Sequence, residues 1–298
     1  MKKVLFGVLT VFMLCYVYYA LSLDDATGLQ KLSQHKIDTR KGTLMINSYE
    51  QAIYANSAIT TNTEPNIMGH AHIVHEIDRI IKQWEPTTKR SILNGAPTGV
   101  LLYGPPGTGK TTLARQICNN ITNATFLHVS PDMLENKYQG ESFKLMKAVF
   151  TLAKKLTPCI VFFDEIDGFM SKRSEMDQSH TNTMKTLFLY GLDSLKNAEV
   201  LVIGATNRPE CLDAALMRRL EIHFLMDYPT NKDKCEYIKS LVGPGDYEPF
   251  VTTTLPPRVS MHGILTFLKF CARRGETTAA NLTTLYAEYN RTYKFFEK

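Results

Sequence analysis

The segment Gly104-Pro105-Pro106-Gly107-Thr108-Gly109-Lys110-Thr111 has the residue types and spacing of a phosphate-binding loop. Its glycines let the backbone curl so that successive N–H groups face an anion, while Lys110 supplies positive charge and the Thr111 hydroxyl is a ligand for Mg²⁺. An apolar run precedes the loop, and a helical pattern beginning at Thr112 follows it, so a bound phosphate would meet a helix N-terminus. The segment predicts binding of ATP or another nucleoside triphosphate with Mg²⁺. A surface turn rich in glycine and proline is the alternative.

Two carboxylates, Asp164 and Glu165, follow the buried-strand pattern of residues 160–163. Because neighbouring residues of a strand point to opposite sides, Asp164 can join the Mg²⁺ shell while Glu165 faces a water. Glu165 would act on that water as its base or orienter when the water attacks the γ-phosphate. Asn207 ends another apolar strand pattern, and its amide could hold the same water. A turn at Asn-Arg-Pro is the alternative for Asn207.

The elements that must position these residues alternate along the chain. Apolar strand patterns are separated by helical patterns, which predicts an α/β fold with a parallel sheet flanked by helices. The strands are expected at 100–103, 125–129, 160–163, 200–203 and 222–225, and the helices at 49–59, 72–84, 143–156 and 182–192. Beyond residue 229 only helical patterns occur, at 232–242 and 264–272. We therefore expect a large α/β domain over 46–229 and a small helical lid domain over 230–298.

The N-terminal segment differs from the rest of the chain. Residues 4–23 carry no charge and have the length of a helix that crosses a bilayer, so a transmembrane anchor is expected over 1–23 and a polar linker over 24–45. A cleaved signal peptide is the alternative. Positive charge before the span favours a cytoplasmic N-terminus, whereas the need for ATP favours a cytoplasmic C-terminal domain. The topology stays open.

Composition excludes several classes of protein. The 298 residues carry a net charge of +5 without a basic stripe, so no nucleic-acid partner is expected. The six cysteines are far apart and include no Cys-x-x-Cys pair, which argues against a disulfide framework or a zinc site. No metal other than Mg²⁺ is implied.

Leu212-Asp213-Ala214-Ala215-Leu216-Met217-Arg218-Arg219 completes a series of motifs. Together with the phosphate loop, the carboxylate pair and Gly204-Ala205-Thr206-Asn207, this order resembles the AAA+ ATPases. The resemblance implies that Asn207 is the sensor-1 residue. It also implies that Arg218 and Arg219 are arginine fingers in a ring of identical subunits, typically a hexamer. Supplied to a neighbour's nucleotide, such arginines neutralise charge on the transferred phosphoryl group. Without the other motifs, two adjacent arginines would predict a solvated helix face.

Lys137-Tyr138-Gln139-Gly140 resembles the first pore loop of the subfamily that contains katanin, spastin and the membrane-anchored mitochondrial sorting ATPases. The resemblance implies protein substrates threaded through a central pore. An aromatic ring at Tyr138 could grip an extended chain with little sequence preference, and Gly140 lets the loop bend. A polar surface loop with an incidental tyrosine is the alternative.

The N-terminal span, Tyr49-Glu50 and Asn66-Ile67-Met68-Gly69 most resemble the mitochondrial sorting (thorase-like) ATPases, which pull misplaced tail-anchored proteins out of the mitochondrial outer membrane. The resemblance implies that Ile67 and Gly69 lie beside the adenine pocket and that Thr112 also belongs to the nucleotide-binding residues. Asp193-Ser194-Leu195 replaces the family's Asp-Gly-Leu. Residues 259–266 lack the Gly-x-Ser-Gly-x-Asp of the sensor-2 region.

These patterns lead to one expected function and two alternatives. We expect a protein-extracting ATPase of the mitochondrial outer membrane with its ATPase domain in the cytosol; the peroxisomal and endoplasmic reticulum membranes are alternative locations. A microtubule-severing ATPase like spastin shares nearly every core motif. A membrane-tethered scaffold that binds nucleotide with weak turnover is the third interpretation.

Overall fold

The computed structural model describes residues 34–39, 42–59, 69–82, 99–120, 124–134, 141–168, 178–196, 198–275 and 278–292. The anchor expected over 1–23, Ile67, and the pore-loop residues Lys137, Tyr138, Gln139 and Gly140 lie outside these ranges. No helix within the ranges is both long enough and apolar enough to cross a membrane.

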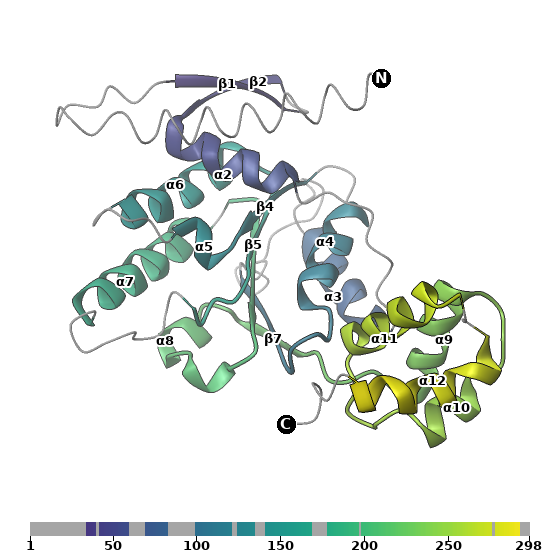
Figure 1. Cartoon of the computed structure of the whole chain (residues 1–298). Coiled ribbons are helices and arrows are strands. Elements are labelled where there is room, and N and C mark those ends of the chain that lie inside the picture. The colour runs from purple at the N-terminus through teal and green to yellow at the C-terminus, as the bar shows by residue number, and fades with distance from the viewer. Residues whose placement is uncertain are drawn as a thin grey trace.

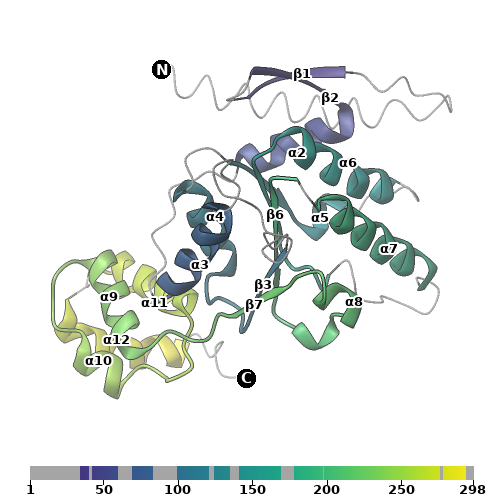
Figure 2. The ribbon, with the colours of Figure 1, turned by 180° about the vertical axis from the view of Figure 1, so that it is seen from behind.

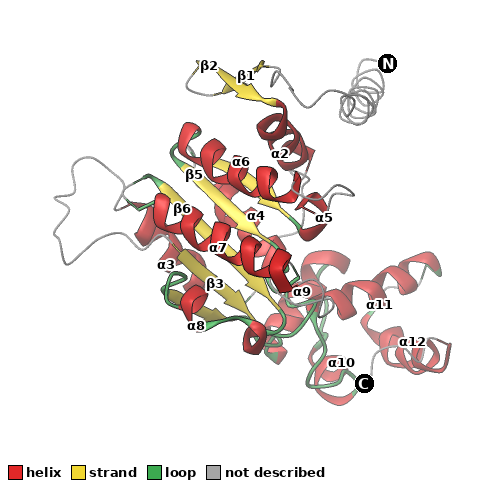
Figure 3. Ribbon diagram, turned by 90° about the vertical axis from the view of Figure 1, so that its left-hand side faces the viewer, coloured by secondary structure: helices red, strands yellow, loops and turns green. Residues whose placement is uncertain are grey.

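A five-stranded parallel sheet forms the centre of the molecule, with the strand order β4-β5-β6-β3-β7. The expectation of a parallel sheet flanked by helices is confirmed. The strands are β3 (Gly99–Tyr103), β4 (Thr125–Val129), β5 (Cys159–Phe163), β6 (Val200–Thr206) and β7 (Ile222–Leu225). Strands β5, β6 and β3 are neighbours, so the phosphate loop, the carboxylate pair and Asn207 leave the sheet at one edge (Figure 3).

Helices cover both faces of this sheet (Figures 1 and 2). One face packs against α3 (Ala71–Lys82) and α4 (Lys110–Asn120). The other packs against α2 (Ser48–Ile59), α5 (Pro131–Leu134), α6 (Glu141–Lys155), α7 (Gln178–Ser194) and α8 (Ala214–Met217). The fully buried strand β5 shows why its sequence is apolar throughout. Ile160 and Phe162 join the α3–α4 core, while Val161 and Phe163 join the core on the opposite face.

Helix α2 is fastened to α6 by a buried ion pair. The Glu50 side chain is 0 % exposed, and both of its carboxylate oxygens lie 2.8 Å from Lys155 Nζ. Asn47 caps the helix reciprocally: its N–H donates to Glu50 Oε2, and its own Oδ1 accepts from the Glu50 N–H, both at 2.9 Å. Ile46, Tyr49 and Ile53 add apolar contacts to the same core. These contacts tie the N-terminal part of the described chain to the sheet layer.

After β7 the described chain is helical. Helices α9 (Asn231–Val242), α10 (Glu248–Thr253), α11 (Met261–Arg273) and α12 (Ala279–Thr292) form a bundle beside α3 and α4 (Figure 1). Helices lie at both positions predicted from the sequence, and α10 and α12 add to them. The bundle has its own core, in which the Phe267 ring meets Phe250 and Tyr289 with centroids 5.7 and 5.5 Å apart.

One segment differs from the sequence-based expectation. Within the polar linker expected over 24–45, the structure has β1 (Gln34–Thr39), paired antiparallel with β2 (Gly42–Asn47). Pairing is entirely local, with Thr39 opposite Gly42, and the hairpin is separate from the larger sheet (Figure 3). Strand β1 is mostly polar, whereas β2 contains the apolar run Leu44-Met45-Ile46, so neither strand has the alternation that predicts a half-buried strand.

Candidate functional site

The phosphate loop connects β3 to α4 by means of backbone that favours glycine. Gly104, Gly107 and Gly109 have φ angles of 146°, 75° and 97°, which side-chain-bearing residues rarely adopt. A Cβ at Gly104 would also lie 2.3 Å from the Met226 carbonyl oxygen. The loop therefore curls tightly ahead of the α4 N-terminus, which is the arrangement that presents backbone N–H groups to a phosphate.

Lys110 begins α4 and turns back over the loop. Its Nζ donates to the carbonyl oxygens of Gly104 and Pro105 at 2.9 and 2.8 Å, and the residue is 8 % exposed. Burial lowers the pKa of Lys110 to about 8, and attraction to Asp164 and Asp167 opposes that shift. The Thr108 hydroxyl also donates to Pro105 O, at 3.0 Å. The ammonium group is thus held inside the turn, where the outer phosphates of a nucleotide would lie.

Thr111 and Asp164 bring two side-chain oxygen atoms together beside the loop. The Thr111 hydroxyl donates to Asp164 Oδ2 at 2.7 Å, which joins α4 to the end of β5. Burial raises the pKa of Asp164, but interactions with His128, Thr111 and the Glu165 N–H outweigh burial and leave the pKa below its usual value. In nucleotide sites Mg²⁺ is usually bound by one or two oxygen ligands from the protein together with the phosphates of the nucleotide. The donor set therefore fits a magnesium–nucleotide complex.

Glu165 occupies a strained backbone position. Its φ is +45°, a left-handed conformation that costs a residue with a side chain about 1–3 kcal/mol. The turn is secured by its N–H, which donates to Asp164 Oδ1 at 3.0 Å, and by its carbonyl, which accepts from the Gly168 N–H at 2.7 Å. The Glu165 residue is exposed at this edge. Strain of this kind is typical of residues whose placement matters for function.

A buried carboxylate, Asp167, ties the turn after β5 to the end of β6. It is 6 % exposed and accepts from the Thr206 hydroxyl at 2.7 Å, and its Oδ2 accepts from Arg208 Nε and Nη2 at 2.9 and 2.8 Å. Thr206 and Arg208 flank the exposed Asn207, so the network fixes the backbone that presents the asparagine amide. This network was not predicted from the sequence. Its only signal was that Asp167 and Arg208 carry opposite charges and lie next to the carboxylate pair and to Asn207.

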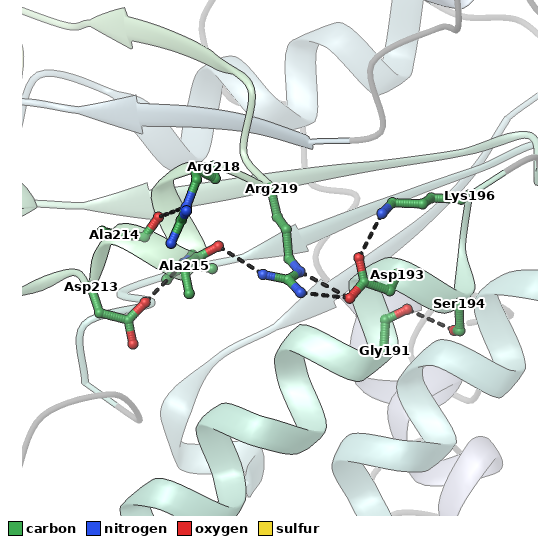
Figure 4. Close-up of polar contacts among 10 residues, drawn as sticks. Gly191, Asp193, Ser194, Lys196, Asp213, Ala214, Ala215, Arg218 and Arg219 are labelled. Carbon is green, nitrogen blue, oxygen red and sulfur yellow. Dashed lines mark hydrogen bonds and ion pairs between the residues drawn. The ribbon is translucent and has the colours of Figure 1, made fainter.

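The two arginines predicted as fingers have different environments (Figure 4). Arg219 donates to Asp193 Oδ2 through Nη2 and Nε at 2.7 and 3.1 Å, and through Nη1 to Ala215 O at 3.1 Å. Arg219, and secondly Lys196, lower the pKa of Asp193 to about 2. Arg218 is exposed, and its Nε donates to Ala214 O at 3.1 Å. One arginine is therefore bound at the end of α7, while the other is presented to solvent.

The helical bundle contacts the nucleotide-binding elements at two glycines. The His262 N–H donates to the Gly107 carbonyl at 3.2 Å, and a Cβ at Gly107 would lie 2.7 Å from Ser260 Oγ. A Cβ at Gly69 would lie 2.8 Å from the Asp233 carboxyl carbon. Although residues 259–266 lack the family motif, the start of α11 still meets the phosphate loop.

A cavity of about 540 Å³ opens beside the phosphate loop, between the loop and the bundle. Its size is within the range of small-molecule sites. It is lined by Pro105, Asp227, Tyr228, Pro229, Pro257 and Arg258.

Most of the residues predicted for a nucleotide site lie at the carboxyl ends of β3, β5 and β6. The loop from Gly104 to Thr111 directly precedes the half-buried Thr112, and Asp164 is bonded to the loop. Glu165 and Asn207 follow the two strands next to β3. Arg218 and Arg219 lie between α8 and β7 and donate to Ala214, Ala215 and Asp193.

A parallel strand, a glycine-rich loop and a helix, with a strand-end carboxylate bonded to the loop threonine, define a P-loop nucleotide-binding protein. The sequence profile of the "ATPase family associated with various cellular activities (AAA)" matches residues 100–228. The human protein named "Outer mitochondrial transmembrane helix translocase" is 34% identical over 259 residues, which cover 81% of this chain and 70% of the human protein. The chain belongs to the AAA family and is an ATPase.

Other relatives give shorter alignments. A zebrafish (Danio rerio) protein of the same name is 40% identical over 179 residues, covering 56% of this chain and only 47% of the zebrafish protein. A probable spastin homolog of Brugia malayi is 40% identical over 163 residues, covering 53% of this chain and 36% of that protein. The identity is thus higher in the shorter alignments.

Proposed function

We propose that this protein is a membrane-anchored AAA ATPase that uses ATP hydrolysis in a ring to pull mislocalised tail-anchored proteins out of the mitochondrial outer membrane. The observation that carries the proposal is the extent of the similarity. Alignment with the human translocase covers 81% of the chain, whereas alignment with the spastin homolog covers 53%. The additional length takes in sequence outside the shared ATPase core.

The site supports hydrolysis through named residues. The loop N–H groups and Lys110 bind and orient the phosphates, and Thr111 with Asp164 holds Mg²⁺, which supplies charge neutralisation between the outer phosphates. Glu165 orients the attacking water and accepts its proton, and Asn207 holds the same water from the neighbouring strand. Pro105, Pro106, Gly69 and Ile67 complete the nucleotide pocket.

Ring assembly gives the two arginines their role. Arg218 is exposed, and Arg219 is bound to Asp193 within its own chain. In a homo-oligomer, most simply a hexamer, these residues would act on the nucleotide of the next subunit. Such arginines contribute roughly 10³-fold or more to phosphoryl transfer in other nucleotidases. Hydrolysis would then depend on assembly.

The extraction step relies on segments outside the described residues. Residues 1–23 anchor the chain in the mitochondrial outer membrane with the ATPase domain in the cytosol. Tyr138 in the pore loop grips the substrate polypeptide. Similarity to proteins named for the outer mitochondrial membrane supports this location.

Microtubule severing is the second candidate, because a probable spastin homolog is also 40% identical, over 163 residues. Both activities use the same motor and differ in the polypeptide that enters the pore. Substrate choice, and not ATP hydrolysis, therefore separates the two candidates.

Reconstitution tests the proposal directly. The full chain is placed in liposomes with a fluorescently labelled tail-anchored protein, and ATP-dependent release of label into the soluble fraction is measured. Glu165→Gln should bind ATP but neither hydrolyse it nor release label. Tyr138→Ala should hydrolyse ATP but release little label.

Four results would contradict the proposal. Release that does not need ATP contradicts the motor, and release that is unchanged in Tyr138→Ala contradicts the pore. Severing of stabilised microtubules by the same preparation, without release of label, would establish the second candidate. Nucleotide-dependent oligomerisation without phosphate release would favour the scaffold interpretation.

A further inference from the structure

A histidine that no motif includes lies beside the magnesium ligands. His128 is on β4, directly opposite Phe162 of β5, and its side chain is 14 % exposed. The imidazole is stacked with Phe162 at 5.5 Å and 19°, and with Phe126 at 6.5 Å and 14°. Phe126 and Phe162 are themselves stacked at 6.2 Å. Two phenyl rings therefore fix the plane of the imidazole.

The orientation of this ring brings one nitrogen toward Asp164. His128 Nε2 lies 3.8 Å from Asp164 Oδ2, the same oxygen that accepts the Thr111 hydroxyl at 2.7 Å. A separation of 3.8 Å is longer than a hydrogen bond but is within the distance of an electrostatic contact. Strand β4 also holds the Asp164 backbone, because the Asp164 N–H donates to the Val129 carbonyl at 2.9 Å.

Each atom of the Asp164 carboxylate thus has a neighbour that restricts it. Oδ1 accepts the Glu165 N–H, while Oδ2 is approached by Thr111 from α4 and by His128 from β4. Carboxylates that hold a metal are generally oriented by such outer groups, and loss of one typically costs about 10–100-fold in metal affinity or activity.

We propose that His128 is a positioning residue that orients the Asp164 carboxylate for the Mg²⁺ of the bound magnesium–nucleotide complex. The competing explanation is that His128 only packs against the two phenyl rings. The two explanations differ in what they require of the side chain: positioning needs the Nε2 donor, whereas packing needs only a flat apolar ring. The inference rests on the proposed role of Asp164 in holding Mg²⁺.

Substitutions separate these requirements. His128→Phe keeps a stacked ring without a polar atom, and His128→Gln keeps a donor near the position of Nε2 without the aromatic ring. His75→Asn, on the exposed face of α3, is the matched control for the loss of a histidine. Asp164→Asn reports whether the ligand itself acts as proposed.

The measurement is the affinity of a fluorescent ATP analogue for the full chain, with Mg²⁺ and with EDTA. Mg²⁺ should strengthen binding by the wild type and by His75→Asn equally. In His128→Phe the enhancement by Mg²⁺ should fall by about 10-fold or more. The affinity in EDTA should be unchanged, and His128→Gln should recover most of the enhancement.

Several outcomes contradict the proposal. Equal losses with Mg²⁺ and EDTA in His128→Phe would show a packing role, and an unchanged enhancement would show no role. If His128→Phe does not fold, as judged by thermal unfolding, a full loss of enhancement in folded His128→Gln would overturn the role of the donor. If Asp164→Asn keeps the enhancement, the magnesium role of Asp164 fails first, which separates that failure from failure of the His128 inference.

Discussion

Lys155→Met should destabilise the protein far more than its exposed position suggests. Lys155 is partly exposed at 35 %, but its partner Glu50 is 0 % exposed. Removing the ammonium leaves the Glu50 carboxylate buried. Of the hydrogen bonds described at its oxygens, the one from the Asn47 N–H remains. A buried charge that loses its partner is costly because the low-dielectric interior cannot solvate it.

The size of the effect follows from these contacts. Loss of one partner of a buried pair costs about 3–5 kcal/mol, and the remaining Asn47 bond places this case near the lower end. At about 2 °C per kcal/mol, the melting temperature should fall by roughly 6 °C. Glu50→Gln removes the charge instead and should cost only about 1–2 kcal/mol. The double variant Glu50→Gln/Lys155→Met should therefore be more stable than Lys155→Met alone.

Thermal unfolding of the detergent-solubilised full chain, followed by circular dichroism, measures these differences. Lys154→Met is the matched control, because Lys154 is the neighbouring exposed lysine at the end of α6. If Lys155→Met and Lys154→Met melt at the same temperature, the reasoning about the buried carboxylate is refuted. A double variant that is less stable than Lys155→Met would refute it equally.

Three further predictions concern the site. The pKa of Asp193 is about 2 in the folded chain, below its ordinary 3.8, so its ion pair stabilises the fold above pH 3.8 and loses that contribution as the pH falls toward 2. In urea unfolding, the stability difference between wild type and Asp193→Asn should therefore shrink from about pH 5 to about pH 3, and a constant difference would contradict the pair. Asp167→Asn should lower kcat by up to roughly 100-fold, because Asn207 loses its support; an equal fall in ATP affinity would point to misfolding instead. Ser260 accepts the Gly263 N–H at the start of α11, so Ser260→Ala should cost about 1 kcal/mol in thermal unfolding, and Ser260→Thr should restore most of it.

The sheet was predictable because its sequence signals are local. Strands β4 and β7 have the predicted bounds, and β3, β5 and β6 contain the predicted runs. Each strand is a short apolar run, and β5 is buried on both faces, which makes its pattern continuous. The hairpin of β1 and β2 was missed because neither strand alternates polar and apolar residues. The lid helices were found where they carry an apolar face, as in α11.

The candidate site was predictable only where a motif marks it. The phosphate loop, Asp164 and Asn207 each belong to a short contiguous motif that follows a strand. Because the strands are parallel, their carboxyl ends bring these motifs to one edge of the sheet. The supporting contacts join residues distant in sequence, as in Asp167 with Arg208, Asp193 with Arg219 and His128 with Asp164. No spacing rule connects such pairs, so only the folded chain reveals them.

The attachment of α2 determines how tension would pass through the protein. Helix α2 packs on α6 and β4, whereas the α9–α12 bundle lies beside α3 and α4 on the other face (Figures 1 and 2). A pull on the chain before Ile46 would therefore act on the sheet through α2, across Glu50 and Lys155. Residues 227–230, which connect β7 to the bundle, lie off that route. The bundle is therefore not on the path by which a pull on the N-terminal segment would reach the sheet.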